Sequence, residues 1–265
     1  MANRPSQSPA FPLPFLEPFR AFWELSSVPA GSALLSFAPD GDGHPVLTLP
    51  GFLGGDGSMS VIRRYLRSKN FDPHPWLLGR NEGPHTSGEG GVLVDQRINE
   101  LYEASGGRKV SLVGWSLGGI MARNAARRIP EKVRQVITLG SPFNSRERTS
   151  SISFLFKAVS GRDPNSEEFR TVLEYNRPPP PVEIPTTAIF TKSDGVVHWS
   201  TCLEEDHPHT ENVEVQASHL GLAVNPLVHY LVAERLALEE GEWSPFDRKA
   251  SAWRRVAFPS TGFDH

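Results

Sequence analysis

The sequence predicts an α/β fold with a mostly parallel central sheet flanked by helices. Short apolar or β-branched runs alternate with helical segments along the chain, which is the order typical of a parallel sheet. The apolar run Lys109–Val113 leads into the glycine-rich turn Gly114–Gly119, and good helix formers follow over Ile120–Arg128. With 265 residues, 38% of them hydrophobic, the chain suits one α/β domain with a substantial core.

The elements follow in order from the amino terminus. Residues 1–30 are predicted to be an extension that carries a short aromatic helix over 14–26. The α/β core is predicted over 31–143 and 182–240, and residues 241–265 form a carboxyl-terminal tail. Apolar periodicity predicts strands at 32–38, 44–50, 75–78, 109–113, 133–139, 185–191 and 212–217, and helices at 60–69, 92–104, 120–128 and 226–239.

The stretch over 144–181 breaks this rhythm of strands and helices. It lies between a strand that ends near Phe143 and a strand that starts near Pro185, and it contains an apolar group followed by a stiff run of four prolines. We therefore predict a small cap or lid of one or two helices there. Phe154 and Phe156 could line a substrate pocket, or they could simply seal the cap onto the domain.

The turn Gly114–Gly119 carries a candidate nucleophile. Its pattern Gly-Trp-Ser-Leu-Gly lies between a buried strand and a helix, which is the arrangement of a nucleophile elbow. Such a turn is too tight for side chains at the flanking positions, so the two glycines leave the hydroxyl of Ser116 exposed at the top of the sheet. The alternative is an ordinary N-capping serine on a glycine-rich turn.

Two polar residues at strand ends can activate Ser116. Asp194 follows the strand predicted at 185–191, and His219 follows the strand predicted at 212–217. Both therefore lie at the carboxyl ends of strands, where open α/β sheets place their active sites. A histidine can accept the serine proton near neutral pH, and a carboxylate holds the imidazole in the required tautomer. The alternatives are a turn aspartate and a solvated loop histidine.

Backbone donors for a developing oxyanion are expected at two places. The loop Gly51–Gly55 follows a predicted strand, and it should supply the N–H of Phe52. The second donor is the N–H of Leu117, which directly follows the candidate nucleophile. Leu53 and Trp115 are candidate substrate contacts. A phosphate-binding loop is disfavoured, because neither a Gly-Lys-Ser/Thr motif nor a GxGxxG spacing is present.

A further loop, Gly79–Pro84, follows the strand predicted at 75–78 on the same side of the sheet. Arg80 or Asn81 could brace the oxyanion loop or contact substrate from there.

Five motifs together resemble the bacterial lipase/esterase branch of the α/β-hydrolase family. They are Leu49–Phe52, Gly114–Gly119, Leu139–Phe143, Ser193–Val197 and Ser218–Gly221, and they lie within residues 45–221. The resemblance implies an α/β-hydrolase fold and hydrolysis of carboxylic esters through an acyl-enzyme, with no cofactor, no metal and a triad of Ser116, His219 and Asp194. Many lipases carry His-Gly at the oxyanion loop, where this chain has Pro50-Gly51. That change keeps the backbone donor and removes any contact from a histidine side chain.

Other functions remain open from the sequence. The same triad would also serve an acyltransferase or a thioesterase, because water access to the acyl-enzyme decides between them. A non-catalytic binding module is disfavoured by the presence of all three triad residues. A metal site formed by Asp194, His198, His207 and His209 is disfavoured, since their spacing is not that of a ligand set.

Composition limits the partners and the compartment. The net charge of −3 and a pI near 6.3 argue against nucleic acid. The single cysteine, Cys202, rules out an internal disulfide. No apolar run reaches the roughly 18 residues of a membrane span, and no signal-peptide pattern is seen, so a cytoplasmic location is predicted. The expected partner is a small-molecule or lipid ester. The aromatic helix over 14–26 either packs on the domain or makes an interfacial or dimer contact.

Overall fold

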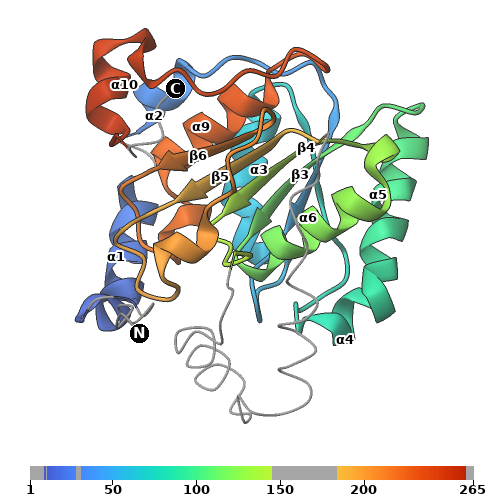
Figure 1. Cartoon of the computed structure of the whole chain (residues 1–265), viewed down its shortest axis with the longest axis horizontal. Helices are drawn as coiled ribbons and strands as arrows, with labels where there is room; N and C mark the ends of the chain where they lie inside the picture. The colour runs from blue at the N-terminus through green and yellow to red at the C-terminus, as the bar shows by residue number, and fades with distance from the viewer. Residues whose placement is uncertain (1–8, 10, 28–30, 145–183, 261–265) are drawn as a thin grey trace.

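The computed structural model describes residue 9 and residues 11–27, 31–144 and 184–260. In these ranges the strands form one six-stranded parallel sheet in the order β2-β1-β3-β4-β5-β6 (Figure 1). The predicted α/β fold with a mostly parallel sheet is therefore confirmed. The strands are β1 (Pro45–Leu49), β2 (Asp72–Pro75), β3 (Val110–Trp115), β4 (Val133–Leu139), β5 (Thr186–Phe190) and β6 (Thr210–Glu214).

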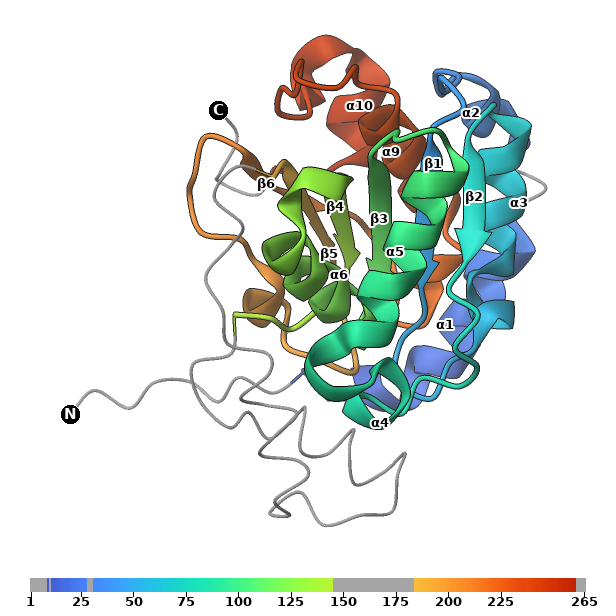
Figure 2. The same ribbon diagram turned by 90° about the vertical axis from the view of Figure 1, so that its right-hand side faces the viewer.

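Helices cover both faces of this sheet. Figure 2 shows α5 and α6 on one face, while α3 and α9 lie on the opposite face. The α-helices of the described ranges are α1 (Leu13–Ser27), α2 (Ser32–Ser36), α3 (Ser60–Ser68), α4 (Pro84–Ser87), α5 (Val92–Ala104), α6 (Leu117–Arg128), α9 (Pro226–Leu236) and α10 (Ala252–Ala257).

The core consists of two apolar layers separated by the sheet. Leu47 of β1 pairs with Leu112 of β3, and both side chains join the layer under α5 and α6. The neighbouring residues Val46 and Val113 join the layer under α3 and α9. Because both faces are covered, every residue of β1 and β4 is buried, including the polar residues Thr48, Arg134 and Gln135.

Most predicted helices form where the sequence placed them. The predicted helix at 92–104 is α5 with the same bounds. The helix α9 begins as Asn225-Pro226 predicted, because the Asn225 side chain accepts a hydrogen bond from the N–H of Leu227 at 2.9 Å and Pro226 occupies the first helical position.

The strand predicted at 32–38 is wrong, because the helix α2 forms there. In a strand the adjacent side chains of Leu34 and Leu35 would point to opposite faces. In the structure both pack against the same apolar layer, Leu35 buried and Leu34 partly buried, which a helix permits.

The strand predicted at 75–78 lies earlier in the chain, where β2 pairs with β1 over Asp72–Pro75. This strand contains two prolines, Pro73 and Pro75, which have no N–H to donate. They are accommodated because β2 is an edge strand of the described sheet, and an edge strand can lack ladder donors. Trp76 directly follows β2 and is fully buried. Its backbone N–H donates a hydrogen bond to Asp56 Oδ1 at 3.0 Å.

Residues 145–183 lie outside the described residues. They include the predicted cap, apart from Asn144, and the candidate substrate contacts Phe154 and Phe156. None of the helices within the described ranges is both long and apolar enough to cross a lipid bilayer.

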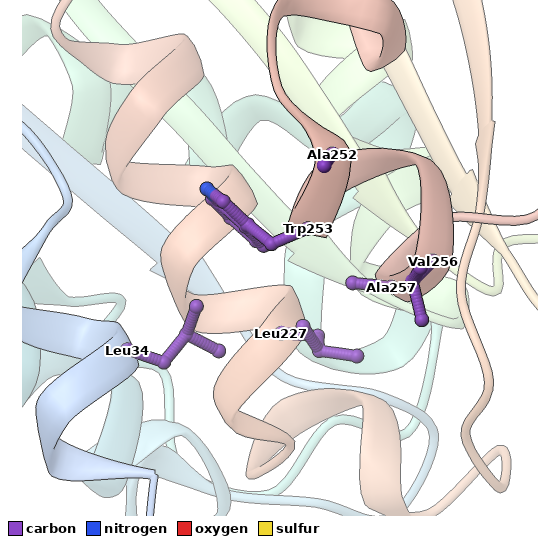
Figure 3. Close-up of a pocket in the computed structure, with 6 residues that line it drawn as sticks. All are labelled: Leu34, Leu227, Ala252, Trp253, Val256 and Ala257. Carbon is purple, nitrogen blue, oxygen red and sulfur yellow. The ribbon is translucent and has the colours of Figure 1, made fainter.

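The carboxyl-terminal tail packs back onto the domain through α10. Phe258 is fully buried among aromatic rings, with its ring centroid 4.8 Å from that of Phe246. An open, apolar groove of about 530 Å³ lies between α2, α9 and α10 (Figure 3). Its lining contains no nucleophilic or titratable side chain. The lining residues are Leu34, Leu227, Ala252, Trp253, Val256 and Ala257.

Candidate active site

Ser116 occupies a strained turn at the carboxyl end of β3. Its backbone has φ 52° and ψ −121°, a conformation that residues other than glycine rarely adopt. The turn is held by a hydrogen bond of 2.8 Å from the N–H of Ser116 to the carbonyl oxygen of Leu139. Such strain costs about 1–3 kcal/mol and is concentrated at functional sites, which makes Ser116 a candidate for chemistry rather than a simple helix cap.

Close packing explains the three glycines around this serine. A Cβ atom on Gly114 would overlap the backbone of Gly119, and a Cβ atom on Gly118 would overlap the carbonyl oxygen of Leu49. A Cβ atom on Gly119 would overlap the hydroxyl of Ser141. The amino-terminal end of α6 therefore lies directly against β1 and β3, as the elbow pattern predicts.

Asp194 and His219 come together at the same edge of the sheet. His219 Nδ1 lies 2.6 Å from Asp194 Oδ2, and both side chains are buried. The other carboxylate oxygen of Asp194 accepts hydrogen bonds from the N–H groups of Val196 and Val197, at 2.8 and 2.7 Å. With Nδ1 engaged by the carboxylate, Nε2 of the same ring is left for proton exchange.

Trp115 links this pair to the serine. Its indole N–H donates a 3.0 Å hydrogen bond to the carbonyl oxygen of His219, and its ring centroid lies 6.0 Å from that of the imidazole. Trp115 directly precedes Ser116, so the contact holds the histidine loop beside the nucleophile elbow. The hydroxyl of Ser116 has no hydrogen-bond partner among the described residues, and catalytic hydrogen bonds often tighten only when substrate is bound.

The surroundings of His219 favour its charged form. Burial alone lowers the pKa of His219, but the charge of Asp194, its hydrogen bond and the charge of Glu17 outweigh that effect. The pKa of His219 is therefore raised above its ordinary value of 6.5. A more basic imidazole is a better proton acceptor once it is neutral.

Gly140 is a site residue whose individual role the sequence did not reveal. It follows β4 with φ 56°, and a Cβ atom there would lie 3.2 Å from His219 Nδ1 and 3.4 Å from Asp194 Oδ2. The same atom would lie 2.6 Å from Leu222 Cδ1. Only glycine therefore combines this backbone conformation with close approach to the pair.

The expected oxyanion loop packs onto the elbow. A Cβ atom on Gly51 would lie 3.1 Å from the Trp115 ring and 3.3 Å from Ser116 Cβ, so the loop runs directly past the serine. Phe52 is the next residue. Leu117 starts α6, where the first N–H groups of a helix lack partners within the helix and favour negative charge.

Asn81 braces this loop, whereas Arg80 is exposed. The fully buried Asn81 donates through Nδ2 to the carbonyl oxygen of Pro50 at 2.7 Å. Its backbone accepts from the N–H of Leu53 at 2.7 Å and donates to the carbonyl oxygen of Gly54 at 2.8 Å. Three hydrogen bonds thus fix the loop from its outer side.

Comparisons with known proteins agree with this fold. A family profile for the alpha/beta hydrolase fold matches residues 78–164, which include the elbow. The chain has the α/β-hydrolase fold. A pimeloyl-[acyl-carrier protein] methyl ester esterase of Aliivibrio fischeri (strain MJ11) is 27% identical over 107 residues. That alignment covers 40% of this chain and 40% of the relative, so it spans well under two thirds of the curated protein.

Solved structures show the same fold at low identity. Aspergillus fumigatus lipase B superposes with a TM-score of 0.55 at 19% identity, over 77% of this chain and 55% of the lipase chain. The pyrethroid hydrolase PytH superposes with a TM-score of 0.55 at 19% identity, over 76% of this chain and 99% of that chain. At such identity the likeness establishes the α/β-hydrolase fold alone.

The histidines that the sequence offered as possible metal ligands lie in different surroundings. His198 Nδ1 lies 2.8 Å from the hydroxyl of Ser200, and His207 and His209 lie in the loop before β6. Within the described ranges no three His, Cys, Asp or Glu side chains are arranged to hold a metal ion. Leu53 and Trp115, the described members of the expected substrate contacts, are half-buried beside the elbow.

Proposed function

We propose that this α/β-hydrolase cleaves carboxylic esters, with Ser116 as nucleophile, His219 as general base and Asp194 as the carboxylate that orients the histidine. The observation that carries the proposal is the buried 2.6 Å contact between His219 and Asp194, beside a serine held at positive φ. A structural turn has no need of a strained serine, and a solvated histidine has no need of a buried carboxylate partner. The combination is what nucleophilic catalysis requires.

The proposed reaction has two stages. His219 Nε2 takes the proton of Ser116 as the Oγ attacks the carbonyl carbon, and the oxyanion binds the N–H groups of Phe52 and Leu117. Collapse of this intermediate breaks the ester C–O bond, and His219 returns the proton to the leaving alcohol. His219 then takes a proton from water, whose oxygen attacks the acyl-enzyme. The carboxylic acid is released, and the proton returns to Ser116.

The substrate class follows from the groups around the elbow and from the relatives. Leu53 and Trp115 offer apolar surface to the acyl or alcohol part of an ester. The similar proteins include a methyl ester esterase, a lipase and a pyrethroid hydrolase, which also favours an ester substrate. We further propose that residues 144–181 form a small cap, with Phe154 and Phe156 in contact with substrate.

The test is hydrolysis of p-nitrophenyl esters from acetate to palmitate. Ser116→Ala should lower kcat by several orders of magnitude, because the variant lacks the attacking oxygen. Ser68→Ala is the matched control, since Ser68 is an exposed serine at the end of α3 whose hydroxyl bonds only its own helix at Tyr65. Retention of more than about a tenth of the activity in Ser116→Ala would contradict the assignment.

A further inference from the structure

The amino-terminal helix α1 has an inverted amphipathic pattern. Glu17, Arg20 and Glu24 are spaced three and four residues apart, so they lie on one face of the helix. This charged face is turned toward the domain, and Glu17 is only 2% exposed. The aromatic side chains point outward, which is the reverse of the usual arrangement. The exposed aromatic residues of this helix are Phe15, Phe19, Phe22 and Trp23.

The carboxylate of Glu17 binds the backbone of both loops that carry the proposed catalytic pair. Glu17 Oε1 accepts from the N–H of Gly195 at 2.7 Å and from the N–H of His219 at 3.1 Å. Glu17 Oε2 accepts from the N–H of Leu220 at 3.0 Å. One side chain therefore connects the residue after Asp194 to His219 itself.

Arg20 joins the same two loops one turn further along α1. Its guanidinium donates to the carbonyl oxygen and hydroxyl of Ser193, at 2.6 and 2.8 Å, and to the carbonyl oxygen of Ala217 at 2.6 Å. These residues come directly before Asp194 and two positions before His219. Arg20 also lies 3.8 Å from Glu17, so the buried carboxylate has a positive partner.

Glu24 completes the contact on the histidine side. Its carboxylate accepts from the N–H of Ser218 at 2.7 Å and from the side-chain amide of Asn225 at 2.9 Å. It makes no contact with the backbone of His219 in the described structure, which distinguishes it from Glu17.

Two glycines allow α1 to approach this closely. A Cβ atom on Gly195 would lie 2.6 Å from the carbonyl oxygen of Leu13 and 2.8 Å from Glu17 Cγ. A Cβ atom on Gly221 would overlap the carboxylate of Glu24. The loops are therefore shaped to receive this helix, independently of the hydrogen bonds.

We propose that Glu17 is a positioning residue of the active site, which fixes His219 relative to Asp194 and places a negative charge beside the histidine loop. A helix docked only for stability would bury apolar side chains, whereas α1 buries charges and leaves its aromatic rings in solvent. A buried carboxylate is costly unless several donors satisfy it, and all three of its N–H donors come from these two loops. The proposal rests on the proposed function of His219 as general base.

The charged groups that contact His219 come from two elements. Asp194 comes from the loop after β5, and Glu17 comes from α1. Arg20 and Glu24 bind the residues before His219, at Ala217 and Ser218. Removal of the Glu17 charge should therefore lower the pKa of His219, while Asp194 continues to hold it up.

Two substitutions of Glu17 separate the effect of its charge from the effect of its side-chain length. Glu17→Gln keeps the side-chain length and one acceptor oxygen but removes the charge. It should lower the pH at which His219 titrates and lower kcat/KM about tenfold, mostly through kcat. Glu17→Asp keeps the charge but is one methylene too short to reach all three N–H groups. It should lower kcat by about 10- to 100-fold with a smaller change in titration.

The readouts are the pH profile of kcat/KM and ¹⁵N NMR titration of the His219 ring in the full-length protein. Glu24→Gln is the matched control, since it removes a similar charge from the same helix, and it should leave the His219 titration at the wild-type pH. The NMR titration needs no substrate. If the wild-type protein hydrolyses no ester, the proposed function fails, and the titration still decides the role of Glu17.

The proposal is overturned if Glu17→Gln leaves the titration of His219 unchanged, whatever happens to the melting temperature. It is also overturned if Glu17→Gln unfolds the protein, because the carboxylate would then serve the stability of the whole fold. Equal shifts in the Glu17→Gln and Glu24→Gln proteins would likewise contradict it, since the effect would then be a general one of charge on α1.

Discussion

The two halves of the candidate site are held in place by different means. The elbow around Ser116 is fixed by close packing of backbone, with glycines at the points where β1, β3 and α6 meet. The loops that carry Asp194 and His219 are fixed by hydrogen bonds to charged side chains of α1. The Glu17 contacts there join residues 178 and 202 positions apart in the sequence. The first half is held by steric packing, and the second by polar contacts with a helix that is distant in the sequence.

This difference decides what each half tolerates. The backbone at the elbow is packed against a central strand and cannot move without disturbing the sheet. An added methyl group there must therefore distort the elbow itself. A peripheral helix held by charges can shift, and its loss would leave the core intact. Added side-chain volume near Ser116 should therefore impair the nucleophile, whereas removal of charged side chains should impair His219 and Asp194.

The largest expected effect tests whether the polar half is catalytic at all. His219→Ala should lower kcat by several orders of magnitude, and Asp194→Asn should do so nearly as much, because the amide favours the wrong tautomer. Steady-state kinetics on a p-nitrophenyl ester measures both. His209→Ala, which changes an exposed histidine, is the control and should retain activity. Normal kcat in Asp194→Asn would remove this pair from the mechanism.

The next largest effect is expected from a substitution in the closely packed elbow around Ser116. Gly118→Ala should lower stability by roughly 1–3 kcal/mol and activity by about 100-fold, because the new methyl group overlaps the Leu49 carbonyl oxygen. Gly57→Ala is the control, since a Cβ atom there meets nothing within 4 Å. Urea unfolding and kinetics provide the two measurements.

Gly195→Ala sharpens the same contrast. Its new methyl group would meet α1 at the Leu13 carbonyl oxygen, and α1 can shift outward, whereas β1 cannot. Gly195→Ala should therefore cost less stability than Gly118→Ala. An equal or greater loss would show that α1 is as rigidly held as the central strands.

The smallest effect is the pH dependence of activity. Because the pKa of His219 is raised, the ring is protonated and inactive as a base below that pKa, and activity should rise with pH through it. The midpoint of kcat/KM should lie above pH 6.5, the ordinary value for histidine. Profiles at constant ionic strength measure it. A midpoint below pH 6.5, or a flat profile from acid to neutral pH, would show that the polar surroundings of His219 do not act as described.

The steric half of the site could be predicted from the sequence, and the polar half only in part. Gly114 and Gly118 flank Ser116 within one short motif, so the turn could be predicted from neighbouring residues. The positions of Asp194 and His219 followed from the ends of strands. The contacts that hold these two residues could not be predicted, since charged residues are mostly exposed and Glu17 occurs in an aromatic helix.

Two parts of the fold could not be predicted correctly from the sequence, for related reasons. The apolar residues of 32–38 suit a strand as well as a helix, and only packing of Leu34 and Leu35 against one layer decides for the helix α2. The strand β2 contains two prolines, and only its place at the sheet edge makes them acceptable. Asn81 is a single polar residue in a loop, and its contact with the oxyanion loop depends on tertiary structure.

The central claim is that Ser116 is an activated nucleophile, and labelling with a fluorophosphonate tests it most directly. The reagent reacts with a serine hydroxyl only when a neighbouring base activates it, and it needs no knowledge of the natural ester. Intact mass and peptide mapping should show one adduct per chain, on Ser116, with labelling abolished in Ser116→Ala and strongly slowed in His219→Ala. A folded wild-type protein that remains unlabelled, or an adduct on another serine, would contradict the account.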